Sequence, residues 1–250
     1  MDSTRSVGVV ALVLVVVTSG CIGFVTGEEA LVYQANEVSV DADAKTATGY
    51  ERQLREELVV NQTVSDRRIE VNNWYARYEK YDDIAEETTG VLAVVATHRV
   101  DVFGHTTNPY ANMSYGGILA NLTADYDTAF GNLENAQFVE NETASVLGTD
   151  ARVGVFATNT TFGGEEVEVK LYVTRVRHGD DVVLAIGGHP TKLPAGEQEI
   201  LAMLEGIQHE TDENASERIA PTGGSSGDSV TALLAPDQGV ADELLAVRAA

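Results

Sequence analysis

Apolar positions along the chain alternate or run together in eight segments, and their spacing predicts extended structure. Short breaks rich in glycine, aspartate and asparagine at 148–150, 162–164 and 178–180 predict hairpins, so neighbouring strands should be antiparallel. The extended segments are residues 31–40, 50–60, 67–81, 91–102, 138–147, 151–158, 167–177 and 181–187.

Two segments follow the helical period instead. In residues 114–127, Ile118, Leu122 and Tyr126 recur every four positions, which predicts an amphipathic helix. A second helix opens near Pro194, with acidic residues in its first turn, where the helix dipole favours negative charge. Its apolar stripe is Ile200, Leu201, Leu204 and Ile207.

The order of these elements is strands, helix, strands, helix. This order predicts an α+β domain, an antiparallel β-sheet with two amphipathic helices packed on it. A long hairpin, an apolar strand and a closing amphipathic helix resemble the PsbP/Mog1-type α/β sandwich. The resemblance implies a two-layer fold and rests on element order alone.

The beginning of the chain has the layout of an export signal. One basic residue, Arg5, precedes an apolar run at 7–17, which is too short for a membrane span of about 20 residues. Ser19 and Gly20 stand before Cys21 and resemble the lipobox of bacterial and archaeal lipoproteins, although Thr18 departs from its preference for a branched apolar residue. The resemblance implies cleavage before Cys21 and lipid attachment to its sulfur. The alternative is an uncleaved terminus with a buried cysteine.

We therefore divide the chain into four parts. Residues 1–20 are expected to be a lipoprotein signal peptide and residues 21–29 a tether. Residues 30–210 form a single α+β domain in this prediction, and residues 211–250 a polar, flexible C-terminal tail that contains a Gly/Ser-rich linker.

The charge of the chain is strongly one-sided. Asp and Glu number 39 against 16 Lys and Arg, for a net charge of -23. Such a surface repels phosphate backbones, so we expect no nucleic-acid partner. High acidity with few lysines resembles the proteins of salt-loving archaea, where concentrated salt screens self-repulsion. An ordinary acidic secreted protein is the alternative.

Asparagine placement also points to export. The pattern Asn-x-Ser/Thr, without proline in the middle, occurs more often than chance would give. Several of these sites should therefore lie on the surface as glycosylation candidates. They are Asn61, Asn112, Asn121, Asn141, Asn159 and Asn214.

Residues with catalytic or metal-binding chemistry are sparse. His98, Asp101 and His105 are the closest group, but strand parity does not bring all three to one face, and zinc takes three or four ligands. A histidine with a local hydrogen bond is favoured over a metal site here. No Gly-x-Ser-x-Gly motif and no phosphate-binding loop occurs, so we predict no catalytic residue and no cofactor.

Aromatic residues cluster in the segment 67–81. Trp74 and Tyr78 share one strand face and could stack on a ligand. At this spacing aromatics also serve as core and cross-strand partners, and that interpretation stays open.

Together these features predict a cell-surface protein, anchored by lipid on Cys21 to the outer face of the cytoplasmic membrane. It resembles haloarchaeal surface lipoproteins of unknown function in its signal, its acidity and its α+β body. We expect a non-catalytic binding or envelope-accessory domain whose partner is an envelope protein or a small-molecule ligand. The alternative is an extracellular metal-dependent hydrolase using His98, Asp101 and His105.

Overall fold

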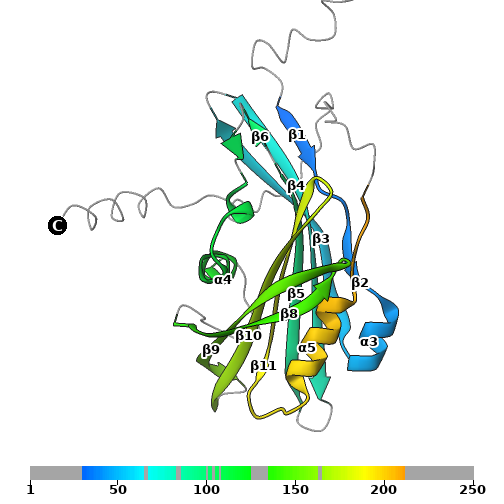
Figure 1. Ribbon diagram of the computed structural model, residues 1–250, viewed down its shortest axis with the longest axis vertical. Helices are drawn as coiled ribbons and strands as arrows, with labels where there is room; N and C mark the ends of the chain where they lie inside the picture. The colour runs from blue at the N-terminus through cyan, green and yellow to red at the C-terminus, as the bar shows by residue number, and fades with distance from the viewer. Residues whose placement is uncertain are drawn as a thin grey trace, which may run out of the picture.

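A large β-sheet dominates the computed structural model (Figure 1). The structure describes residues 30–64, 67–82, 86–99, 101–102, 105–106, 108–124, 135–162 and 165–211. Within them the order of strands in the sheet is β1-β4-β5-β11-β10-β9-β8, and β3 pairs with β4. The bounds are β1 Leu31–Gln34, β2 Val38–Val40, α3 Ala42–Thr48, β3 Glu51–Val64, β4 Arg67–Asp82, β5 Glu87–His98, β6 Asp101–Val102, β7 His105–Thr106, a 3-10 helix Pro109–Ala111, α4 Tyr115–Ala124, β8 Gln137–Val146, β9 Thr149–Phe162, β10 Glu165–His178, β11 Asp181–Pro190, α5 Gly196–Glu205 and β12 Ile207–His209.

The predicted fold class is wrong. Instead of an α+β sandwich, an antiparallel sheet with two amphipathic helices packed on it, the chain forms a mostly β structure with few, short helices. The eight-stranded sheet is mixed, because β1 runs parallel to β4, with Leu31 opposite Ile69. Local periodicity indicates which segments are extended, but it carries no information on which distant strand a segment joins.

Long antiparallel hairpins build the second half of the sheet. Gly148 and Gly179 have φ values of 71° and 64°, a left-handed conformation that glycine adopts without strain, and each lies in a tight turn. The turn at Gly179 places His178, the last residue of β10, opposite Asp181, the first residue of β11. These hairpins also fix which side chains face each side of the sheet.

The main core lies between one sheet face and a layer made of α5, α3, β2 and β12. Ile200, Met203 and Leu204 of α5 are fully buried against the strands. Tyr78 and Tyr172 are also fully buried on this face of the sheet. The short strand β12 pairs with β2 and not with the large sheet, so it closes this layer.

A second core lies on the opposite sheet face, where α4 packs with Ile118 and Leu119 buried. Val169, Leu171 and Val173 of β10 contribute the buried sheet residues on this side. The large sheet therefore has apolar residues on both faces, which is why strands such as β5 and β11 are almost continuously apolar.

The segment 31–40, expected as one extended piece, contains two strands in different sheets. β1 pairs with residues 69–72 of β4, and beyond that point β5 takes over the same edge from Trp74 onward. The chain then leaves the large sheet, and β2 pairs with β12. This change of sheet brings the beginning of the domain against the end of β5 and the β10–β11 hairpin.

None of the described helices is long and apolar enough to cross a membrane.

Candidate functional site

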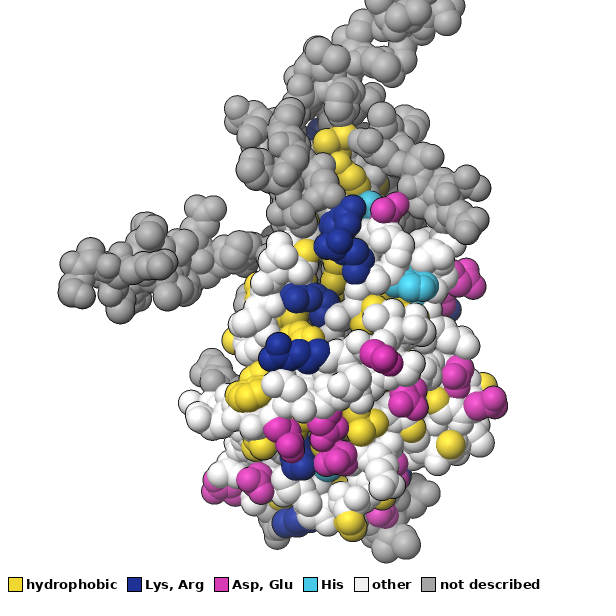
Figure 2. Space-filling model, in the orientation of Figure 1, with side chains coloured by type: hydrophobic (Ala, Val, Ile, Leu, Met, Phe, Trp, Pro, Cys, Tyr) yellow, Lys and Arg dark blue, Asp and Glu magenta, His cyan; other side chains and the backbone are white. Residues whose placement is uncertain are grey.

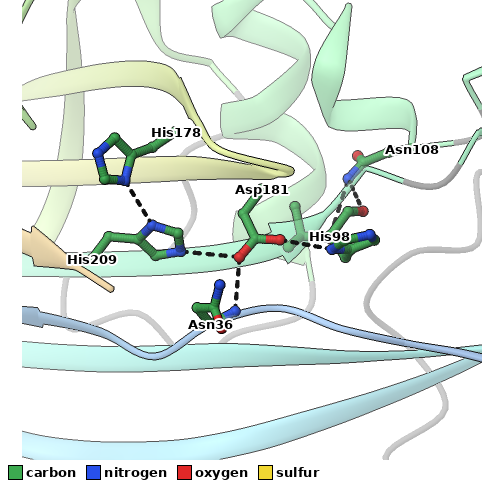
Figure 3. A network of polar contacts seen from close by, with 7 residues as sticks. Asn36, His98, Asn108, His178, Asp181 and His209 are labelled. Atoms are coloured by element: carbon green, nitrogen blue, oxygen red, sulfur yellow. Dashed lines mark hydrogen bonds and ion pairs between the residues drawn. The ribbon is translucent and has the colours of Figure 1, made fainter. Parts of the chain in front are cut away.

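Three histidines and one aspartate form a hydrogen-bonded chain at one end of the sheet (Figure 3). Asp181 accepts at Oδ1 from His98 Nδ1, at 2.8 Å, and at Oδ2 from His209 Nε2, at 3.1 Å. The backbone N–H of Asn36 also donates to Oδ2, at 2.7 Å, and His178 Nδ1 lies 3.0 Å from His209 Nδ1. We call these residues the Asp181 network.

Four separate segments position this network. His98 is the last residue of β5 and pairs across the sheet with Asp181. Asn36 follows β1, and His209 ends β12, so the network holds both ends of the described domain against the β10–β11 hairpin. Asp181 is only 1% exposed, which makes its carboxylate dependent on these partners.

The carboxylate of Asp181 is ionised at neutral pH. Burial would raise its pKa, but the hydrogen bonds from His209, His98 and the Asn36 amide outweigh burial and lower the pKa from 3.8 to about 2. Because an ionised carboxylate only accepts, His98 Nδ1 and His209 Nε2 must both donate. Desolvation, together with the nearby His209, lowers the pKa of His178, so its neutral ring donates from Nδ1 to His209.

The same hydrogen bonds orient the outer ring nitrogens of His98 and His178, because Nδ1 is the donor in each ring. When the His98 ring is neutral and Nδ1 donates to Asp181, the lone pair is on Nε2, which is how a carboxylate orients a catalytic histidine. No serine, threonine or cysteine of the described part of the chain donates a hydrogen bond to it. The network therefore has an oriented base but no neighbouring nucleophile in that part.

Of the three residues proposed as metal ligands, the structure describes the side chain of His98 alone. Residues 101–102 and 105–106 form the small hairpin β6–β7, but the side chains of Asp101 and His105 lie outside the described residues. His98 turns its ring to Asp181 and stacks on Tyr33, with ring centres 5.4 Å apart. Across the residues that are described, no group of three or more His, Cys, Asp or Glu side chains could hold a metal ion.

A second feature is an open groove of about 470 Å³ between α4 and the strands β8, β9 and β10. Tyr115 forms one wall, and its hydroxyl donates to the Arg152 carbonyl at 2.8 Å. Gly154 of β9 makes this possible, since a Cβ there would lie 2.6 Å from the Tyr115 ring. The lining residues are Met113, Ser114, Tyr115, Gly116, Phe138, Arg152, Phe156 and Arg175. We call it the arginine–aromatic groove.

The charged groups of the groove are both guanidinium groups. Arg152 and Arg175 lie over the Tyr115 ring, 5.7 and 6.0 Å from its centre. Arg175 Nη1 donates to the carbonyls of Tyr110 and Met113, both at 2.7 Å, and Arg152 Nε donates to Asn141 Oδ1 at 2.6 Å. Among the described residues, neither guanidinium group forms an ion pair with a carboxylate. No Asp or Glu is among the described residues that line the groove.

The face of the molecule that carries basic side chains is visible in Figure 2, where Lys and Arg gather above most of the Asp and Glu side chains of that face. On β10, Arg175 and Arg177 point to the same side of the sheet because they are two residues apart. The basic groups are thus concentrated locally in a chain whose net charge is -23.

The two aromatics predicted to face a ligand do not share a pocket. Tyr78 is completely buried, and its hydroxyl accepts from the Val40 N–H at 2.9 Å. Trp74 is partly buried against the same core, and the Arg55 guanidinium lies 5.0 Å from the centre of its ring. Tyr78 therefore joins the large sheet to β2, and Trp74 contacts β3 within the large sheet.

The remaining predicted positions divide between the surface and the parts not described. The side chains of Asn61, Asn112, Asn141 and Asn159 are exposed, as a glycan acceptor requires. The side chain of Asn121, on α4, lies outside the described residues, as do Cys21 and Asn214. The lipid attachment and the occupancy of these sequons stay predictions.

Sequence reasoning missed Asp181, His178 and His209 as partners, and it missed the groove altogether. His98 and Asp181 are 83 positions apart, and only the pairing of β5 with β11 joins them. One signal was present: Asp181 opens an apolar strand directly after a turn, where a buried carboxylate needs partners. The alternation of Arg175 and Arg177 within β10 was the corresponding signal for a basic sheet face.

These features define a class of protein: a β-rich domain on a mixed sheet, with a buried His–Asp network at one sheet end and an open basic and aromatic groove. The chain belongs to the family described as a domain of unknown function, DUF6517, whose model matches residues 37–208. The match covers every lining residue of the groove, together with His98, His178 and Asp181. No curated protein matches the chain.

Proposed function

We propose that the chain is an exported, lipid-anchored domain that binds a ligand in the arginine–aromatic groove without transforming it. The observation that carries the binding role is the pair Arg152 and Arg175, two cations without carboxylate partners among the described residues of a very acidic protein. In such a protein, surface arginines are expected to find acidic neighbours. Guanidinium donors that face an open groove are suited to an external anion.

Binding rather than catalysis fits the use of the titratable groups. Asp181 accepts three hydrogen bonds, and the donors of His98 and His209 that face it are occupied. The described residues that line the groove are arginines, aromatic residues, a methionine, a serine and a glycine, and none of them is a histidine, a carboxylate or a cysteine. Its chemistry is that of recognition by charge and stacking.

The anchoring half of the proposal comes from the first residues of the sequence. The apolar run at 7–17 and the small residues before Cys21 support cleavage and lipid attachment there. Nine residues, 21–29, would then separate the lipid from the described domain, and nine extended residues span at most about 30 Å. The start of the domain would consequently be held close to the outer face of the cytoplasmic membrane.

Replacement of the cysteine tests this anchoring. In Cys21→Ser the sulfur that accepts the lipid is missing, so we expect the protein to leave the membrane fraction or to retain its uncleaved signal. Ser19→Ala is the matched control, because alanine preserves the small side chain before the cysteine. Cell fractionation and intact-mass measurement check both variants. Membrane retention of Cys21→Ser at the wild-type mature mass would disprove lipid anchoring.

A further inference from the structure

We propose that the arginine–aromatic groove binds a small organic anion: a carboxylate joined to a flat apolar or aromatic body. This inference rests on the proposed binding function and names the class of ligand. It is carried by three properties of the groove, namely its donors, its apolar wall and its size.

The donors are fixed in place but not used up. Arg175 Nη1 is held by two backbone carbonyls in the segment before α4, while its Nε and Nη2 make no hydrogen bond within the described part of the protein. Arg152 is held at Nε by Asn141, and neither of its Nη groups has a hydrogen-bond partner among the residues that the structure describes. A planar guanidinium that is already oriented loses little freedom on binding, and its paired N–H groups match the two oxygens of a carboxylate.

The apolar wall is unusual for an acidic surface. Phe138 is 54% exposed at the groove and meets Phe156 edge-to-face, with ring centres 5.6 Å apart. A ligand with a flat apolar body would cover Phe138 and recover the free energy that its exposure to water costs.

The groove's size and surroundings favour a small molecule. Its volume of about 470 Å³ falls in the range of ligand sites, about 300–1,000 Å³. A nucleic acid would meet the net charge of -23 over the rest of the surface. A membrane surface is flat, and it would use exposed cations such as Arg177 as readily as Arg152, whereas the groove places Arg152 and Arg175 beside the same aromatic ring, that of Tyr115.

Three probes separate the contributions of charge and apolar body. Benzoate has both, benzamide has the same shape without the charge, and acetate has the charge without the ring. We expect saturable binding of benzoate to the full-length chain, measured by titration calorimetry or ligand-observed NMR at constant ionic strength. Benzamide and acetate should bind at least about tenfold more weakly, since a charged bidentate contact and a buried ring each contribute roughly this factor.

Three variants locate the site. Arg152→Gln removes one guanidinium, and Gly116→Leu fills the groove from α4, where a Cβ has ordinary contact with Phe156 at 3.8 Å. Both should weaken benzoate binding at least about tenfold, because the first removes a charged contact and the second occupies the space that the ligand needs. Arg177→Gln is the matched control: it removes the same charge from β10 outside the groove, and it should change affinity less than twofold. Arg175 is left intact, since its contacts also hold the turn before α4. Unchanged thermal unfolding shows that each variant folds.

Several results would overturn the inference. They are the absence of saturable benzoate binding, equal binding of benzamide, and binding that Arg152→Gln and Gly116→Leu leave unchanged. Binding to phosphatidylglycerol vesicles that falls equally in Arg152→Gln and Arg177→Gln, without benzoate binding, would make the basic face a membrane contact instead. The titration needs no membrane, so its failure leaves anchoring through Cys21 standing, and release of Cys21→Ser from the membrane decides anchoring alone.

Discussion

Asp181 accepts three hydrogen bonds, and they join segments that are distant in sequence. Asn36 and Asp181 are 145 positions apart, and His209 closes the network from the far end of the domain. The side chain is nearly inaccessible, so water cannot replace a lost partner. The network therefore has a structural role, because it holds the two ends of the domain together. This role does not depend on any chemistry at His98 Nε2.

Replacing this carboxylate by an amide should destabilise the protein. In Asp181→Asn one acceptor becomes an NH₂ group facing donors from histidine or Asn36, so the free energy of unfolding at pH 7 should fall by about 2–4 kcal/mol. Asp180→Asn, in the exposed position next to it, should change the value by less than about 0.5 kcal/mol. Denaturant unfolding measures both. Equal values for the two variants would contradict this structural role of the Asp181 network.

The same residue makes a prediction about acid. The pKa of Asp181 is about 2 in the folded state against 3.8 unfolded, so its stabilisation is complete above pH 3.8 and is lost as pH falls through about 2. This amounts to about 2 kcal/mol, since one pKa unit corresponds to about 1.4 kcal/mol. His178 acts in the same direction from a higher pH, because its lowered pKa lets the unfolded chain take up a proton first. The gap in unfolding free energy between wild type and Asp181→Asn should narrow between pH 4 and pH 2, and a constant gap would contradict the assignment.

At the scale of elements, α5 shows which forces hold a helix to this sheet. Lys80 Nζ lies 2.6 Å from Glu199 Oε1, and Lys170 Nζ lies 3.0 Å from Glu197 Oε2. All four side chains are partly exposed, so each pair contributes only about 0–1 kcal/mol. The fully buried stripe on the inner side of α5 contributes more, because each such side chain stabilises by about 1.5–3 kcal/mol.

Close packing of α5 depends on a glycine in β11. A Cβ at Gly187 would lie 2.7 Å from Ile200 Cγ2, so Gly187→Ala must push the helix away from the sheet. We expect a loss of about 1–3 kcal/mol in unfolding free energy. Gly116→Ala in α4 is the matched control, since its Cβ meets only an ordinary contact at 3.8 Å and alanine favours helix by up to about 1 kcal/mol. Thermal and denaturant unfolding check the pair, and a neutral Gly187→Ala would contradict this packing.

The strands also show which parts of the fold local sequence patterns could predict and which parts they could not. Alternation and turn residues located the β8–β9 and β10–β11 hairpins, because these depend on neighbouring residues alone. The parallel pairing of β1 with β4 and the β2–β12 pair depend on contacts between distant segments, which periodicity does not record. The Asp181 network and the arginine–aromatic groove were missed for the same reason. The sequence suggested His98 as a metal ligand, but only the order of strands in the sheet shows that it lies beside Asp181. The same order brings the guanidinium groups of Arg152 and Arg175 together beside Tyr115.

For the whole molecule, charge is the dominant unbalanced term. A net charge of -23 on one chain produces repulsion that folding must overcome, and Figure 2 shows acidic side chains spread over the lower part of the drawn face. The pKa of Glu142 shows this repulsion at one carboxyl group, because burial and the negative charges of the nearby Glu197 and Glu140 raise it. The few cations are therefore important where they gather, at the arginine–aromatic groove and under α5.

Salt should consequently stabilise the protein through screening. The Debye length falls from about 10 Å at 0.1 M to about 3 Å at 1 M, so most of the repulsion between surface carboxylates disappears over this range. We expect the melting temperature to rise by at least about 5 °C between 0.1 and 1 M KCl, equivalent to about 1–3 kcal/mol for a chain of this size. Glycine betaine at matched osmolality is the control, because a zwitterion is excluded from the surface without screening charges. A melting temperature that stays constant in KCl, or that rises equally in betaine, would show that repulsion between carboxylates does not limit the stability of this fold.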